Sequence, residues 1–277
     1  MEKLTRILLI VDGLEPGAKL LEKTVRLARY FGAHIELLLG DSADSKRLAS
    51  LCNERGYDEV VLSSVFRGAA SLNDVILRHV HERPADLVVK APAAGLDASA
   101  GGWAADDQEL AAACPVPLCL MRARPWREPV RIAAAVNISA DEPVLSRSIV
   151  HTAGFLNLGC EGELDVIYSE GETHDEVLRM ARAVKLARLV REFHVSGEHV
   201  RRLEGAPEKT LLPIAASGSY DILLLGAVTQ RAGWSRLPAS LTRRLVSAFD
   251  GDVVLVKETT AAEARLERAT LRSRAAP

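Results

Sequence analysis

The chain has 277 residues, of which 48% are hydrophobic and 26% charged, and its formal net charge is −2. This length accommodates two domains of ordinary size, each able to bury its own core. The even charge balance argues against a general nucleic-acid binder, which would carry a basic surplus.

The first apolar run, residues 7–11, is too short for a signal peptide, which needs a longer apolar segment and a small-residue cleavage site. No run approaches the roughly 20 apolar residues of a membrane span, so we expect a cytoplasmic protein without membrane partners. The run instead has the length of a strand buried on both faces. Apolar residues between Leu20 and Ala28 follow at helical spacing after Pro16, a residue that favours helix starts.

Short apolar runs and helical patterns continue to alternate as far as residue 121. Strand-like runs lie at 35–39, 86–90 and 116–121 and before a Gly-Ala-Ala turn at 68–70, and helices are predicted at 72–82 and 105–113. Alternation of this kind implies a parallel sheet with right-handed crossovers, which is a doubly wound α/β structure.

The second half of the chain repeats the first. Five blocks recur in the same order, which indicates a duplication. They are RILLIVD and RIAAAVN, IELLL and LDVIY, the Gly-rich turns at 68–70 and 205–207, DLVVK and DILLL, and PLCLM and GDVVLVK. Helices predicted at 144–158, 174–193, 209–216 and 240–248 complete the second unit.

We therefore expect two tandem, Rossmann-like, five-stranded parallel sheets, with domains at 1–124 and 125–258 and a tail at 259–277 that is a frayed helix or disordered. The closing strands at 116–121 and 252–256 would be exposed apolar edges in separate units. We expect these strands to pair within the chain as a pseudo-dimer, with homodimerisation as a further step.

A doubly wound sheet binds ligands at the carboxyl ends of its strands, next to the point where the strand order reverses. Polar residues follow the first strand of each unit at this position. Asp12 ends the first strand of the first unit, and Asn137 ends its counterpart in the second. Either side chain can hydrogen-bond a base or sugar, or cap the following turn.

The second unit also has elements of an anion site. A loop runs from Gly226 to Ser240, where a helix begins and presents free backbone N–H groups, although Ser240 is equally suited to capping that helix. In the first unit Asp106, Asp107 and Glu109 occupy the corresponding helix start, and they would repel a phosphate.

These features resemble the universal stress protein family, in its tandem two-domain form, over the whole chain except the tail. Members carry an acidic residue after the first strand, a G-x-P turn after the third, and G-x2-G-x9-G followed by Ser or Thr after the fourth. Here Asp12 matches the acidic residue, 205–207 matches the turn, and the last motif keeps Gly226 and Ser240.

The resemblance implies an adenine nucleotide alpha hydrolase-like fold and a site for ATP or AMP in the second unit. Thr229 and Ala239 replace glycines of the motif, and each adds a Cβ where backbone must approach phosphate. Asn137 cannot accept two ribose protons as a carboxylate does. Carried over by position, the site consists of Val136, Asn137, Ser169, Gly226, Thr229, Ala239, Ser240, Leu241 and Thr242.

No catalytic or metal-binding motif is present in the sequence. There is no G-x-G-x-x-G fingerprint, phosphate-binding loop or G-x-S-x-G elbow, and the four cysteines contain no C-x-x-C pair. We expect reduced, buried thiols and a non-catalytic stress-response protein, with weak ATP hydrolysis left open. Two alternatives are an interaction scaffold without nucleotide binding and an apolar-ligand binder acting through the first domain.

Overall fold

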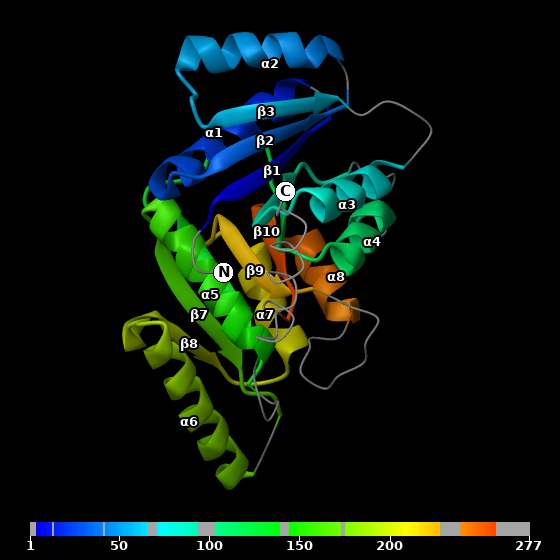
Figure 1. Cartoon of the computed structure of the whole chain (residues 1–277). Helices are drawn as coiled ribbons and strands as arrows, with labels where there is room; N and C mark the ends of the chain where they lie inside the picture. Colours follow the sequence, from blue (N-terminus) through cyan, green and yellow to red (C-terminus); the bar gives the residue numbers. More distant parts are fainter. Residues whose placement is uncertain are drawn as a thin grey trace, which may run out of the picture.

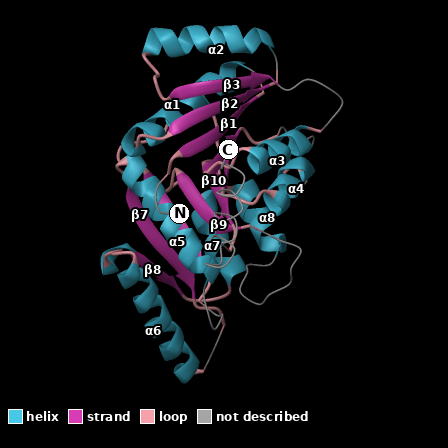
Figure 2. Ribbon diagram, in the orientation of Figure 1, coloured by secondary structure: helices cyan, strands magenta, loops and turns pink. Residues whose placement is uncertain are grey.

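The computed structural model describes residues 4–12, 14–40, 42–65, 71–93, 103–138, 144–172, 175–227 and 239–258. The strands form one ten-stranded sheet in the order β3-β2-β1-β4-β5-β10-β9-β6-β7-β8, and the helices cover both of its faces (Figures 1 and 2). The predicted turn at 68–70, Thr229 and the predicted tail at 259–277 lie outside the described residues.

The first unit contributes one half of this sheet. Its elements are β1 (Arg6–Val11), α1 (Leu14–Phe31), β2 (His34–Leu39), α2 (Ser42–Arg55), β3 (Val60–Val65), α3 (Leu72–Glu82), β4 (Leu87–Lys90), α4 (Ala105–Ala113) and β5 (Leu118–Leu120). Strand order reverses between β1 and β4, which are parallel neighbours.

The second unit repeats the arrangement, with the reversal between β6 and β9. Its elements are β6 (Arg131–Val136), α5 (Val144–Cys160), β7 (Glu163–Ser169), α6 (Glu176–Glu192), β8 (Val200–Leu203), α7 (Pro207–Ala216), β9 (Ile222–Gly226), α8 (Ala239–Ala248) and β10 (Asp252–Val256). The exact domain boundaries at 124/125 and 258/259 stay a prediction.

The two halves join through their closing strands. β5 and β10 pair antiparallel, with Leu118 opposite Leu255 and Leu120 opposite Val253, whereas the strands within each unit pair in parallel. Each closing strand therefore covers the other's apolar edge. The predicted fold class and the intramolecular pseudo-dimer are confirmed.

The continuous apolar runs form strands because both faces of the sheet are covered. Alternate residues of β1 pack into different cores, since Ile7 and Leu9 face α1 and α5 while Leu8 and Ile10 face α3 and α4. Among the described residues no helix combines the length and apolar character needed to cross a membrane.

A buried polar cluster fastens the units to the connecting segment. The Lys23 ammonium on α1 lies 2.5 Å from the Asp252 carboxylate on β10 and 4.7 Å from the centre of the Trp126 ring. Asp252 also accepts hydrogen bonds of 2.7 Å from the Arg122 backbone N–H and the Trp126 indole N–H. We refer to Lys23, Arg122, Trp126 and Asp252 as the junction cluster.

Several bounds differ from the sequence predictions, among them the starts of α6 at Glu176 and of α7 at Pro207, which were predicted at 174 and 209. Helix α1 begins at Leu14, before Pro16, and not after it. Pro16 therefore lies in the first turn, where backbone N–H groups have no carbonyl partner within the helix and the N–H that proline lacks is not needed. Helix α2 was not predicted, because its sequence is mostly polar and contains no clear apolar stripe. Helix α5 extends to Cys160, two residues beyond the predicted end.

Candidate functional site

The carboxyl ends of β6, β7 and β9 form the candidate site of the second unit. The register aligns Ala134 with Leu224 and Val136 with Tyr168, so Val136 and Asn137 lie between Gly226 and Ser169. The fold thus brings four of the predicted residues to one edge of the sheet, next to the reversal of strand order where such sheets bind ligands.

The main chain at Asn137 is fixed by the first turns of α5. The Asn137 N–H donates to Ser146 Oγ at 3.1 Å, and that hydroxyl donates to the Asn137 carbonyl at 2.7 Å. Val136 is buried and Asn137 is half-buried. The two hydrogen bonds set the direction in which the chain leaves β6.

The Ser169 hydroxyl is already engaged within the protein. It donates to the Gly205 carbonyl at 2.7 Å and accepts from the Thr210 hydroxyl at 3.1 Å. Ser169 therefore ties the end of β7 to the turn that opens α7. Gly205 has a φ of +112°, a conformation for which glycine is suited, which explains the glycine of the 205–207 turn.

Gly226 is required for packing as well as for its place at the strand end. A Cβ added there would lie 2.6 Å from Leu145 Cδ2, closer than side chains approach one another. Leu145 is a buried core residue in the first turn of α5. The glycine therefore allows α5 to lie close to the end of β9.

The first turn of α8 supplies the remaining described residues. Ser240 is exposed, whereas Leu241 is buried in the core shared with Leu225 and Leu245. Thr242 is fully buried, and its hydroxyl has no hydrogen-bond partner among the described residues. It is one of seven such buried side-chain atoms in the described part of the chain, and a buried hydroxyl left unsatisfied costs about 1–3 kcal/mol. Nothing is described of the Ala239 side chain.

The corresponding edge of the first unit contains a cavity of about 590 Å³. Beside this cavity Lys90, at the end of β4, forms a buried ion pair with Asp107 on α4. The lysine charge is therefore already neutralised within the protein. Lys90 was not singled out from the sequence, although a lysine ending the apolar run DLVVK was a signal. The lining comprises Ile10, Asp12, Ser71, Leu72, Asn73, Lys90, Ala91, Pro92, Ala93, Asp106 and Glu109.

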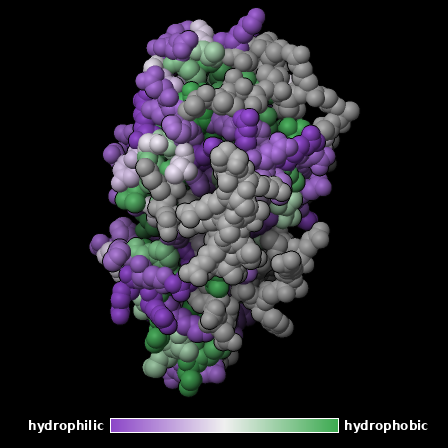
Figure 3. Space-filling view, viewed as in Figure 1, coloured by the Kyte–Doolittle hydropathy of each residue, from purple (hydrophilic) through white to green (hydrophobic). Residues whose placement is uncertain are grey.

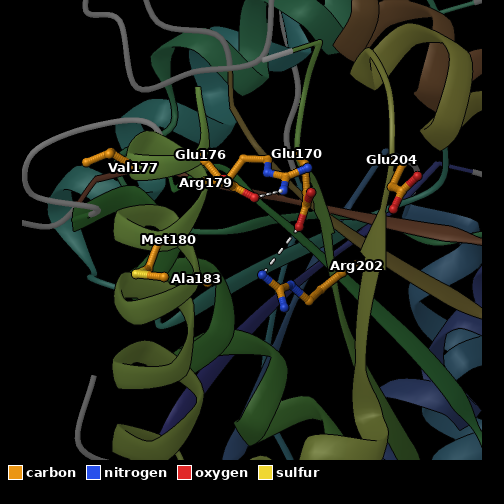
Figure 4. Close-up of a pocket in the computed structure, with 8 residues that line it drawn as sticks. All are labelled: Glu170, Glu176, Val177, Arg179, Met180, Ala183, Arg202 and Glu204. Atoms are coloured by element: carbon orange, nitrogen blue, oxygen red, sulfur yellow. Dashed lines mark hydrogen bonds and ion pairs between the residues drawn. The ribbon is translucent and has the colours of Figure 1, made fainter. Parts of the chain in front are cut away.

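A second cavity, of about 610 Å³, lies beside α6 and the ends of β7 and β8 (Figure 4). Arg202 on β8 lies 3.3 Å from Glu170, which follows β7, and Arg179 lies 3.4 Å from Glu176 one turn away on α6. None of the predicted site residues that the structure describes is among those that line it. This cavity is therefore separate from the candidate site.

The outer half of α6 is unusually apolar for an exposed helix. Val177 is 79% exposed, Met180 70% and Val184 65%, and the hydrophobic colouring of this helix is visible in Figure 3. The three residues follow one another at helical spacing on the face opposite buried Leu186.

The four cysteines are free thiols. Cys114, Cys119 and Cys160 are buried and Cys52 is half-buried, and burial raises the pKa of Cys160 to about 12. These thiols pack as small apolar groups, as predicted, with Cys52 less deeply buried than expected. No group of three potential ligands among the described residues could hold a metal ion.

No protein-family model matches the chain. The universal stress protein E homolog of Haemophilus influenzae is 21% identical, covering 72% of this chain and 71% of that protein. A solved structure from Pseudomonas aeruginosa, described as a universal stress protein, superposes with a TM-score of 0.75 at 21% identity, covering 97% and 98% of the two chains. A universal stress protein from Archaeoglobus fulgidus gives a TM-score of 0.63 at 13% identity, covering 92% and 97%.

The sheet order and the pairing of β5 with β10 place this chain among tandem, doubly wound α/β proteins, in which two units join through their closing strands. The similarities are more specific. The resemblance to the universal stress protein family is confirmed, and the chain has the fold of the two-unit structures to which it is similar over almost its full length.

Proposed function

We propose that this protein is a non-catalytic stress-response protein of the cytoplasm that binds one adenine nucleotide, ATP or AMP, in its second unit. The nucleotide would lie at the carboxyl edge of the sheet, between the ends of β6 and β9 and the start of α8. In this proposal the nucleotide binds in the second unit alone, and the paired closing strands hold the two units together.

The buried hydroxyl of Thr242 is the observation that supports this proposal best. It has no partner among the described residues, although it is fully buried at the start of α8. A ligand group that hydrogen-bonds to it would relieve the cost of leaving it unsatisfied. The neighbouring helix start offers free N–H groups, which favour phosphate oxygens.

The other residues have supporting roles in the proposal. Asn137 follows β6 on main chain held by Ser146, and it would face the sugar or base. Ser169 would contribute backbone rather than its hydroxyl, because that hydroxyl is engaged with Gly205 and Thr210. Ser240 is exposed and free of packing constraints, so it would contact phosphate.

A thermal-shift titration with ATP and AMP tests the proposal through Thr242→Val, which removes the hydroxyl and keeps the shape. Losing one hydrogen bond to ligand, worth about 0.5–1.5 kcal/mol, should weaken binding about 2-fold to 12-fold. Without nucleotide the variant should be as stable as the original protein or more stable, because a buried unsatisfied group is gone.

Thr24→Val is the matched control. Thr24 is also a fully buried helical threonine, but its hydroxyl donates to the Leu20 carbonyl at 2.7 Å and it lies in α1 of the first unit. The control should lose stability without changing the nucleotide-induced shift. Equal nucleotide shifts for Thr242→Val and Thr24→Val would contradict the assigned role of Thr242.

A further inference from the structure

A buried ion pair stands at the edge of the first unit. Lys90 is 6% exposed and Asp107 is 1% exposed, and one carboxylate oxygen of Asp107 contacts the Lys90 ammonium. The other oxygen accepts a 2.8 Å hydrogen bond from the backbone N–H of Ala93, in the segment that follows β4. Both carboxylate oxygens are therefore satisfied by groups that surround the strand end.

The duplication shows what replaces this pair in the second unit. Asp86 and Asp221, which precede β4 and β9, are 135 residues apart, and the same offset relates Lys90 to Leu225 and Asp107 to Thr242. Leu110 of α4 and Leu245 of α8 are related in the same way and both pack into the core on this face of the sheet. One copy therefore has a cation and a carboxylate where the other has a leucine and a hydroxyl that none of the described residues contacts by a hydrogen bond.

The groups that hold Asp107 are those that proteins use to hold a phosphate. They are a lysine ammonium, a backbone N–H after a parallel strand, and the first turn of a helix that carries a positive partial charge. Asp107 is the third residue of α4, so its own carboxylate occupies the position in which an anion would be bound.

We propose that Asp107 is a built-in anion that fills the anion position of the first unit. Ligands that carry a phosphate are thereby excluded from the adjoining cavity of about 590 Å³, which is left to ligands without negative charge. Asp12, Asp106 and Glu109 line the same cavity and oppose an incoming anion further. The Lys90–Asp107 pair is thus the residue difference that sets the two units' ligand preferences apart.

The alternative is that the pair only stabilises the helix packing. An uncharged pair at these positions is compatible with the fold, as Leu225 and Thr242 show in the second unit, and buried ion pairs often contribute no more stability than apolar substitutes. The two explanations differ in what happens when the carboxylate alone is removed. Only a true anion position should then accept a free anion.

The test uses Asp107→Thr, which leaves the buried Lys90 without its counter-ion. Thermal unfolding is followed in increasing inorganic phosphate, against potassium chloride of the same ionic strength. All variants carry Thr242→Val, which weakens phosphate binding in the second unit, and the phosphate response that remains there is common to all of them. The matched control is Lys90→Leu/Asp107→Val, which removes the cation as well as the carboxylate and adds no hydroxyl, so the difference from this control tests the first unit independently of the proposed nucleotide site.

We expect phosphate to raise the unfolding temperature of Asp107→Thr by about 5 °C or more at a concentration 100-fold above its Kd. The parent and the double variant should show only the smaller shift that all the variants share. An Asp107→Thr protein that responds to phosphate no more than the double variant would overturn the proposal.

A second variant covers the case in which Asp107→Thr does not fold in chloride. Asp107→Ser removes the carboxylate with a smaller side chain and leaves room for a free anion beside the Lys90 ammonium and the Ala93 N–H. Recovery of cooperative unfolding by phosphate in either variant supports the built-in anion. Failure of phosphate to rescue both variants, while the double variant folds, contradicts it.

Discussion

Asp252→Asn is expected to be among the most destabilising single changes in the chain. The substitution keeps the shape of the side chain but removes the charge that faces Lys23, 2.5 Å away, at a position where the two side chains are 8% and 2% exposed. Removing one partner of a buried ion pair costs about 3–5 kcal/mol, because the remaining charge is left uncompensated. For a protein of this size that corresponds to a fall in Tm of about 6–20 °C.

Calorimetry or circular dichroism would measure this fall against Asp250→Asn as the control. Asp250 pairs with Arg124 at 2.8 Å, but its side chain is 80% exposed, so its loss should cost about 1 kcal/mol or less. Lys23→Met/Asp252→Asn removes both buried charges, keeps an oxygen that can accept from the Arg122 or Trp126 N–H, and should recover part of the stability. If Asp252→Asn and Asp250→Asn had equal effects, the junction cluster would not be fastening the two units.

Three further predictions concern stability and reactivity. Burial acts to raise the pKa of Asp165, but hydrogen bonds from Tyr220 and His199 and the charge of nearby Arg201 outweigh burial and lower that pKa. The stabilisation that the Asp165 carboxylate contributes to the fold is therefore complete above the pKa of the unfolded chain, near 3.9, and is lost as pH falls through the lower pKa of the folded protein. Asp165→Asn should thus be destabilised at neutral pH, by about 1.5–3 kcal/mol if one charged hydrogen bond is lost, and the difference should shrink below about pH 4 in acid titrations, whereas a constant difference would exclude this linkage. Gly226→Ala should cost about 1–3 kcal/mol in chemical denaturation, because the new Cβ meets Leu145 at 2.6 Å, and an unchanged midpoint would mean that α5 has room to move. Alkylation followed by mass spectrometry should label the half-buried Cys52 first, and rapid native labelling of the buried thiols would contradict their packing.

Much of the fold could be predicted from the sequence because its strongest signals are local. Helices α3 and α4 begin and end where the sequence patterns place them, at Leu72–Glu82 and Ala105–Ala113. The pairing of the closing strands followed from the duplication and from the need to cover two apolar edges. Helix α2 was missed because it packs with few apolar side chains, so its sequence lacks a helical stripe.

The candidate site was less predictable because its properties depend on contacts between distant residues. The sequence motif identifies Ser169 and Gly226, but only the structure shows that the Ser169 hydroxyl is engaged with Gly205 and that Gly226 lies against Leu145. Asp107 was predicted to repel phosphate, whereas the direct contact with Lys90 depends on how α4 packs against β4. The nine predicted positions stay a prediction for ligand binding.

Isothermal titration calorimetry of the intact protein with ATP and with AMP tests the central proposal most directly. The two units differ at the decisive position, with Asp107 in one and Thr242 in the other, so we predict one nucleotide per chain. Thr242→Val should weaken that binding about 2-fold to 12-fold. No heat of binding at millimolar nucleotide, or two equivalent sites per chain, would contradict the account.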